Sequence, residues 1–300
     1  MEEEALKHQI ATAVELQSLV HVTRTISAAK VREYEQTVAS IEAYGRTIAA
    51  GLQVVMKRQP REMTLPSGRR DYFGAVVVGS DQGLCGNFNE RIAEYAIERM
   101  TEFKLTPESR AIVVVGERPA LHIEAAGYEI EDRLPFVGGH DAITRVILRV
   151  LERIEEWSNR RRIDRVALFY NKPGEASTFQ PEMQVLLPID VAWLQGLAEQ
   201  KWPGRTIPTF SQDWDSLFAG LVKHHIFFTI YRALVESLAS ENTSRLRAMQ
   251  AAQRNIDERL EDLHVAYHRL RQSSITGELL DITTGYEAVA GGDASASGVV

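Results

Sequence analysis

A glycine-rich loop holds the residues of this sequence whose types and spacing come nearest to a reactive site. The loop runs from Gly79 to Asn89 and contains the carboxylate of Asp81 and the single cysteine of the chain, Cys85. It follows an apolar run, the position in which dinucleotide-binding α/β proteins hold phosphate at a helix N-terminus. Its glycine spacing fits neither G-x-G-x-x-G nor the phosphate loop, and it contains no lysine. We therefore expect its glycines to serve tight turns and close packing.

No second group in the sequence completes a catalytic or metal site. Cys85 has no adjacent histidine or other base, so we interpret it as a small buried apolar residue. Glu261 and His264, with His268 one turn later, resemble half of a carboxylate-bridged metal site, but the second Glu-x-x-His pair is missing. We therefore expect no catalytic residue, no metal and no other cofactor in the isolated chain.

The composition is that of an ordinary globular protein: 300 residues, 44% hydrophobic, with a net charge of -7. This charge gives no general basic field for nucleic acid or anionic lipid, and we expect the cluster Arg160–Arg162 to complement a helix C-terminus. A single cysteine excludes an internal disulfide and is typical of a reducing compartment. No stretch approaches the roughly 18 apolar residues of a membrane span, so we expect no direct membrane insertion.

The loop needs a sheet to position it, and the middle of the chain supplies candidate strands. Three apolar, β-branched runs at 74–79, 111–116 and 165–170 are typical of strands buried on both faces, and 179–189 predicts a further strand. Helical segments fall between them at about 87–104, 117–126 and 141–159. The pattern predicts a central Rossmann-like α/β domain over 70–208, with a mainly parallel sheet.

Both ends of the chain carry heptad seams, in which apolar positions recur at alternating steps of three and four. The first seam is Val31, Tyr34, Val38, Ile41, Gly45, Ile48, Leu52 and Val55. The second is Leu246, Met249, Gln253, Ile256, Leu260, Leu263, Tyr267 and Leu270. Each stripe is narrow and therefore needs a partner helix, and the nearest candidate is the other one.

These observations predict an α/β fold class: a long antiparallel coiled coil of the N- and C-terminal helices plus the central domain. The first helix occupies 1–58 and ends before Pro60 and Pro66, and the second occupies 209–288, with Ser211 or Asp213 as its N-cap. The small, polar segment 289–300 is expected to be a disordered tail. Before Val31 the seam includes the polar residues Gln17 and Arg24, which we expect to loosen the pairing.

Three segments together resemble the gamma subunits of F-type rotary ATP synthases. Ser80–Asn89 resembles the S-D-x-G-L-C-G-x-x-N loop of that family, and Ala239–Met249 resembles its A-S-E-x-x-x-R-M-x-A-M segment. Arg271–Leu279 resembles R-Q-x-x-I-T-x-E-L. With the order helix, α/β domain, helix, the resemblance covers nearly the whole chain.

The resemblance implies a non-catalytic rotor subunit on the cytoplasmic face of the bacterial inner membrane. Such a subunit couples flow of H+ or Na+ through the membrane sector to ATP synthesis and hydrolysis, and it regulates the ATPase. The implied partners are the α and β subunits of the catalytic hexamer, the epsilon subunit and the membrane c-ring, with no nucleic acid. The residues that the resemblance implies as contacts with β subunits are Arg271, Gln272, Asp81, Gln82, Cys85, Asn87, Glu241 and Arg245.

One segment departs from the family pattern. Between Leu16 and Lys30 only Ala28, Ala29 and Lys30 match clearly, which indicates a divergent bacterial branch. Two other classes of protein fit parts of the sequence. A stand-alone nucleotide-binding α/β protein with a coiled-coil dimerisation arm would bind nucleotide as an isolated chain, whereas the absence of a phosphate-loop lysine predicts no such binding. A purely structural coiled-coil spacer fits the two ends but leaves the buried sheet without a purpose.

Overall fold

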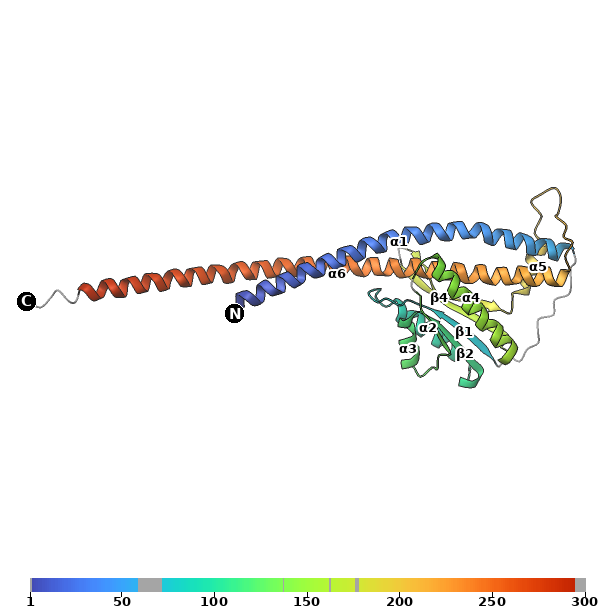
Figure 1. The fold of residues 1–300 in the computed structure, drawn as a ribbon, viewed down its shortest axis with the longest axis horizontal. Helices are drawn as coiled ribbons and strands as arrows, with labels where there is room; N and C mark the ends of the chain where they lie inside the picture. Colours follow the sequence, from blue (N-terminus) through green and yellow to red (C-terminus); the bar gives the residue numbers. More distant parts are fainter. Residues whose placement is uncertain (1, 59–71, 137, 162, 176–177, 295–300) are drawn as a thin grey trace, which may run out of the picture. The chain divides into compact units, whose positions relative to one another are not determined.

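The computed structural model describes residues 2–58, 72–136, 138–161, 163–175 and 178–294. The chain divides into two compact units, which we call the terminal unit (1–24 and 249–300) and the central unit (25–248). Two long helices, α1 (Glu2–Arg58) and α6 (Trp214–Ala294), contribute residues to both units (Figure 1). The predicted α/β class with two long terminal helices is confirmed.

The two long helices pair antiparallel within each unit. In the terminal unit, the hydroxyl of Tyr267 donates to Glu3 at 3.4 Å, so that the start of α1 meets a late turn of α6. In the central unit, the hydroxyl of Tyr44 lies 2.8 Å from Nδ1 of His224. Every position of the two predicted seams is at least partly buried, which is what a heptad stripe facing a partner helix requires.

The polar seam residues of the terminal unit are bonded across the helix pair. Nε2 of Gln17 donates to Oδ1 of Asp257 at 2.6 Å, and Nη1 of Arg24 donates to Oε1 of Gln253, also at 2.6 Å. The expectation that these residues loosen the pairing stays a prediction. Each polar group meets a polar group of the other helix, and such pairs fix the register of a coiled coil.

A five-stranded sheet forms the centre of the central unit. Its strands are β1 (Phe73–Val78), β2 (Arg110–Val115), β3 (Asp132–Leu134), β4 (Arg165–Pro173) and β5 (Phe179–Leu187). The order is β3-β2-β1-β4-β5, in which β5 runs antiparallel to β4 and the other neighbours are parallel. All six residues of β1 are buried, which agrees with the prediction of strands covered on both faces.

Helices cover both faces of this sheet (Figure 1). Val76 and Val78 of β1 pack in one core with α4 (His140–Glu156) and with residues 226–239 of α6. Ala75 and Val77 point the other way, into a core with α2 (Phe88–Glu102) and α3 (Glu117–Ala125). The period-two alternation of a strand therefore places α6 directly against the sheet.

Several elements differ from the sequence prediction. The helix α5 (Val191–Glu199) and the short strand β3 were not predicted, and a π-helical turn at Trp157–Arg161 follows α4. Within that turn Arg161 pairs with Glu131, whereas residue 162 lies outside the described residues. The α5 helix starts at Asp190, whose side chain accepts from the backbone N–H of Ala192 and Trp193.

The ends of the long helices also differ in part. α6 begins at Trp214, where Oδ2 of Asp213 accepts from the backbone N–H of Ser216 at 3.1 Å. It continues to Ala294 because no proline interrupts it, so residues 289–294 of the predicted tail are helical. Residues 295–300, as well as Pro60 and Pro66, lie outside the described residues.

Candidate functional site

The loop between β1 and α2 is closed by the side chain of Asn89 in the first turn of α2. Its Oδ1 accepts from the backbone N–H of Ser80 at 2.9 Å, and its Nδ2 donates to Oγ of Ser80 at 2.9 Å. A Cβ at Gly79 would lie 2.6 Å from this same Oδ1. Glycine is therefore needed here for close packing, as the sequence predicted.

Asp81 links the loop to two other segments of the central unit. Its Oδ1 accepts from the backbone N–H of Glu117 at 2.9 Å, and its Oδ2 accepts from that of Phe136 at 2.6 Å. Glu117 opens α3, so the carboxylate also lies where the positive end of that helix dipole favours a negative charge. Asp81 therefore has a structural role: it holds the loop against the segments that contain Glu117 and Phe136.

Cys85 is buried beneath the loop, with 1% of its surface exposed. Its Sγ lies 3.4 Å from Nδ2 of Asn89 and 3.8 Å from Oγ of Ser80. Burial raises the pKa of the Cys85 thiol, and the hydrogen bond with Ser80 opposes this only in part. A thiol held protonated and covered is a poor nucleophile, so the interpretation of Cys85 as a small buried residue is confirmed.

Residues of α6 hold the loop from the other side. Nε and Nη2 of Arg245 each donate to the carbonyl oxygen of Gly83 at 3.2 Å, and Nη2 also donates to that of Gln82 at 3.3 Å. The preceding residue of α6, Ser244, donates its hydroxyl to the carbonyl oxygen of Cys85 at 2.6 Å. We call these contacts the loop attachment. Backbone groups that are 159 to 163 residues away in sequence thus become partners of α6.

The charge of Arg245 is balanced inside the protein by Glu241. Nη2 of Arg245 donates to Oε1 of Glu241 at 2.6 Å, and both side chains are at least nine-tenths buried. Burial raises the pKa of Glu241, while the neighbouring guanidinium opposes the rise. An i,i+4 pair on one helix face therefore presents a guanidinium whose remaining donors point at the loop carbonyls.

This geometry argues against phosphate binding by the loop. A phosphate cradle presents backbone N–H groups and positive charge to the ligand. Here three carbonyl oxygens of the loop, those of Gln82, Gly83 and Cys85, point at donors of α6. Within the described part of the chain, no group of three or more His, Cys, Asp or Glu could hold a metal ion. Likewise, none of the helices described there is long and apolar enough to cross a membrane.

The predicted site residues fall into two groups. Cys85, Glu241 and Arg245 are buried and bonded within the chain, and Asp81 is bonded through both carboxylate oxygens. The side chains of Gln82 and Asn87 in the loop, and of Arg271 and Gln272 on α6 in the terminal unit, are exposed. Whether any of these residues contacts a β subunit stays a prediction.

Sequence reasoning missed Leu84, which the loop presents outward with 65% of its surface exposed. Its backbone has a φ of 62°, in the left-handed region that a leucine rarely adopts. The neighbouring Gly86 has a φ of 60°. Because the hydrogen bonds to α6 fix this backbone, Leu84 projects from a rigid loop. The amino-acid types of Gly83 and Leu84 alone do not predict this backbone conformation.

A family model described as ATP synthase matches residues 2–289 of the chain. Among curated proteins, the ATP synthase gamma chain of Pasteurella multocida is 26% identical over 286 residues, covering 95% of this chain and 98% of that protein. The ATP synthase gamma chain of Brucella ovis is 27% identical over 298 residues, with coverage of 95% and 98%.

Solved structures share the fold. The central stalk and c-ring of the Tetrahymena thermophila mitochondrial ATP synthase includes a chain with a TM-score of 0.56 and 18% identity, covering 78% of this chain and 99% of that one. The rotor of the Euglena gracilis mitochondrial ATP synthase gives a TM-score of 0.59 at 16% identity, covering 91% and 99%. Since the family model spans almost the full length, the chain belongs to the ATP synthase family, among its gamma chains.

Proposed function

We propose that this chain is the central-stalk rotor subunit of an F-type ATP synthase and is not itself catalytic. It couples ion flow through the membrane sector to ATP synthesis and hydrolysis in the β subunits and regulates the ATPase. The observation that carries this proposal is the loop attachment, in which Arg245 and Ser244 of α6 hold the carbonyl oxygens of the β1–α2 loop. A rotor needs such a connection between its shaft and the body that is packed against it.

The packing of α6 within the central unit supports the same proposal. Residues 226–239 of α6 share one continuous core with β1, β2, β4 and α4. Close-packed cores resist deformation, so a torque applied to α6 moves the α/β body with it. The buried pair of Glu241 and Arg245 adds a directional contact one turn beyond that core.

The proposed partners are the α and β subunits around the helix pair, and the epsilon subunit and membrane c-ring at the α/β body. The exposed residues Arg271, Gln272, Gln82 and Asn87 are proposed as direct contacts with β subunits. Asp81, Cys85, Glu241 and Arg245 are proposed to act on β through the conformation of the loop, because their polar groups are already bonded inside the chain. The proposed location is peripheral, on the cytoplasmic face of the bacterial inner membrane.

Reconstitution tests this function. The chain is mixed with purified α and β subunits, and assembly and ATP hydrolysis are measured with and without it. The proposal expects a complex containing one copy of the chain per hexamer and an ATPase rate that depends on its presence. A chain that neither joins the hexamer nor changes its rate would overturn the proposal.

Titration of the isolated chain with ATP and ADP tests the alternative of a stand-alone nucleotide-binding protein. The rotor proposal expects no saturable binding at the loop, since its carbonyl oxygens face donors of α6. Saturable binding that is lost on changing Gly83 or Asn87 would favour the alternative.

A further inference from the structure

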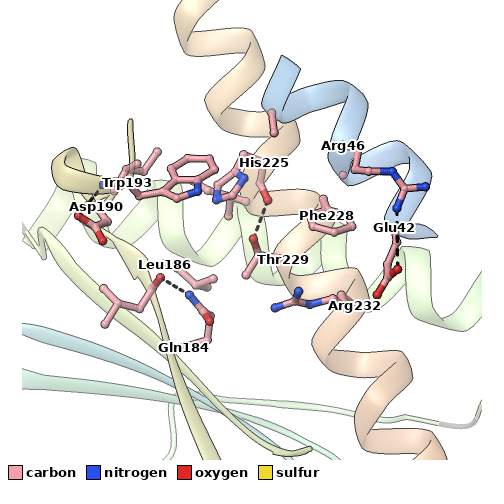
Figure 2. A pocket seen from close by; sticks show the side chains of 15 residues that line it. Glu42, Arg46, Gln184, Leu186, Asp190, Trp193, His225, Phe228, Thr229 and Arg232 are labelled. Carbon is pink, nitrogen blue, oxygen red and sulfur yellow. Dashed lines mark hydrogen bonds and ion pairs between the residues drawn. The ribbon is translucent and has the colours of Figure 1, made fainter. Parts of the chain in front are cut away.

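A cavity of about 520 Å³ lies in the central unit between α1, β5, α5 and α6. Figure 2 shows side chains from these elements converging on it. The volume falls within the range of about 300 to 1,000 Å³ that is usual for small-molecule sites. The cavity is distinct from the loop attachment, and none of the predicted site residues lines it.

One wall of the cavity is aromatic. The rings of Trp193 and His225 stack with centroids 4.5 Å apart and an interplanar angle of 28°. Phe228 lines the cavity from the next turn of α6. Burial, and then the charge of Arg232, lowers the pKa of His225, so its imidazole is neutral at neutral pH. The wall therefore offers flat, uncharged faces to a planar group.

Arg232 brings a cation to the lining of the cavity. Its Nε is buried and has no hydrogen-bond partner among the residues that the structure describes. Its one ion pair there, with Oε1 of Glu236, has an Nε to oxygen distance of 3.6 Å, longer than the roughly 2.7 to 3.2 Å of an N–H···O hydrogen bond. In Figure 2 its guanidinium points from α6 toward Gln184 on β5, into the space beside the aromatic wall.

Of the two acidic residues of the lining, Asp190 is hydrogen-bonded within the chain. Oδ1 of Asp190 accepts from the backbone N–H of Ala192 and Trp193 as the N-cap of α5. Glu42 lies 3.9 Å from Nη1 of Arg46, in an exposed pair on α1. The lining holds two arginines, the exposed Arg46 on α1 and Arg232 beside the aromatic wall, and a guanidinium fork matches a carboxylate in geometry.

We propose that this cavity binds a small aromatic carboxylate, with the ring against Trp193, His225 and Phe228 and the carboxylate on Arg232. The ring lies against the aromatic wall, and the carboxylate meets the exposed part of the Arg232 side chain, 37% of which is accessible. Such a ligand bridges α5 and α6, two elements that the chain brings together only through folding.

Ligand-observed NMR titration of the full chain tests the proposal, with benzoate as the probe. Benzamide has the same ring without the charge, and inorganic phosphate has the charge without the ring. We expect benzoate to bind at least about tenfold more tightly than either, a ratio within reach of one charge-assisted hydrogen bond. Equal affinity for benzoate and benzamide, or no saturable benzoate binding at millimolar concentration, would overturn the proposal.

Variants of the chain locate the binding. Arg232→Lys keeps the charge and loses the fork, and Trp193→Leu removes the stacking face; each is expected to weaken benzoate at least about tenfold. Arg145→Gln is the matched control, because Arg145 is an exposed arginine on α4 outside the cavity. Circular dichroism checks that each variant is folded. Benzoate affinity that is unchanged in a folded Arg232→Lys or Trp193→Leu variant would show that the site lies elsewhere.

Discussion

The guanidinium of Arg245 donates to the carbonyl oxygen of Gly83, a residue 162 positions earlier in the chain, at 3.2 Å. The same guanidinium is paired with Glu241 one turn back on α6. The buried guanidinium is bonded both to the loop carbonyl oxygen and to the Glu241 carboxylate, so it holds two distant segments in one geometry. Loss of either bond would leave a buried polar group without a hydrogen-bond partner. The position of the exposed Leu84 beside Gly83 follows from this contact.

Arg245→Ala is expected to destabilise the chain strongly. It leaves the carboxylate of Glu241 buried without its cation, a change that costs about 3 to 5 kcal/mol in comparable buried pairs. The free energy of unfolding from urea titration measures this. Arg254→Ala, an exposed arginine of the same helix, is the control. The double variant Glu241→Ala/Arg245→Ala should be less destabilised than the sum of its parts. Equal, small losses in Arg245→Ala and Arg254→Ala would contradict the structural role.

The sequence indicated the helices and the parallel strands because their periods are local properties. A heptad keeps one stripe toward a partner over many turns, as from Val31 to Val55, and an apolar β-branched run such as 74–79 is stable when buried on both faces. The role of Arg245 could not be read in this way. Its spacing from Glu241 predicts a pair on one helix face, but the carbonyl oxygens that complete its bonds come from a distant loop. The helix α5 was missed because it is short and pairs Leu194 and Leu197 with α1 through tertiary contacts.

Gly45→Ala tests the close approach of α1 and α6. An added Cβ would lie 2.3 Å from Cζ of Phe228, so the ring would have to move out of its packed position. Overpacking of this kind costs about 1 to 3 kcal/mol. Thermal and urea unfolding of the variant measure the loss. Gly220→Ala is the control, since a Cβ at Gly220 on α6 meets no atom within 4 Å. Addition of Phe228→Ala should recover part of the loss caused by Gly45→Ala; if both glycine changes stabilise the chain alike, the helices are not in contact there.

Cys85 is expected to react slowly with thiol reagents in the folded chain. It is 1% exposed and burial raises its pKa, so both access and the thiolate fraction are low. Labelling with a maleimide at neutral pH, with and without denaturant, gives the protection. Arg245→Ala, where it remains folded, should speed the labelling because it frees the loop that covers the thiol. Labelling of the native chain as fast as of the denatured chain would contradict the buried position.

The burial of His225 predicts a loss of stability on acidification. Burial, and then the charge of Arg232, lowers its pKa in the folded chain, whereas the unfolded residue titrates at about 6.5. As pH falls below that value the unfolded chain binds the proton first, so the free energy of unfolding decreases until the folded pKa is passed. His225→Gln should lose less stability than the native chain between pH 7 and pH 5. Parallel profiles for the native chain and His225→Gln would contradict the sign of this shift.

Arg271→Ala and Gln272→Ala are expected to weaken the coupling of rotation and catalysis without destabilising the chain. Both side chains are exposed on α6, next to the seam residue Leu270. Substitutions at exposed helix positions change the free energy of unfolding by at most about 0.5 kcal/mol, whereas hydrogen bonds to charged groups contribute about 1.5 to 3 kcal/mol. ATP-driven ion pumping in the reconstituted complex should therefore fall while urea unfolding of the isolated chain stays the same. Arg269→Ala, two positions from Arg271, is the control for loss of positive charge on this helix. If pumping is unchanged in Arg271→Ala and Gln272→Ala, or falls equally in Arg269→Ala, these residues do not form the specific contact with β that we propose.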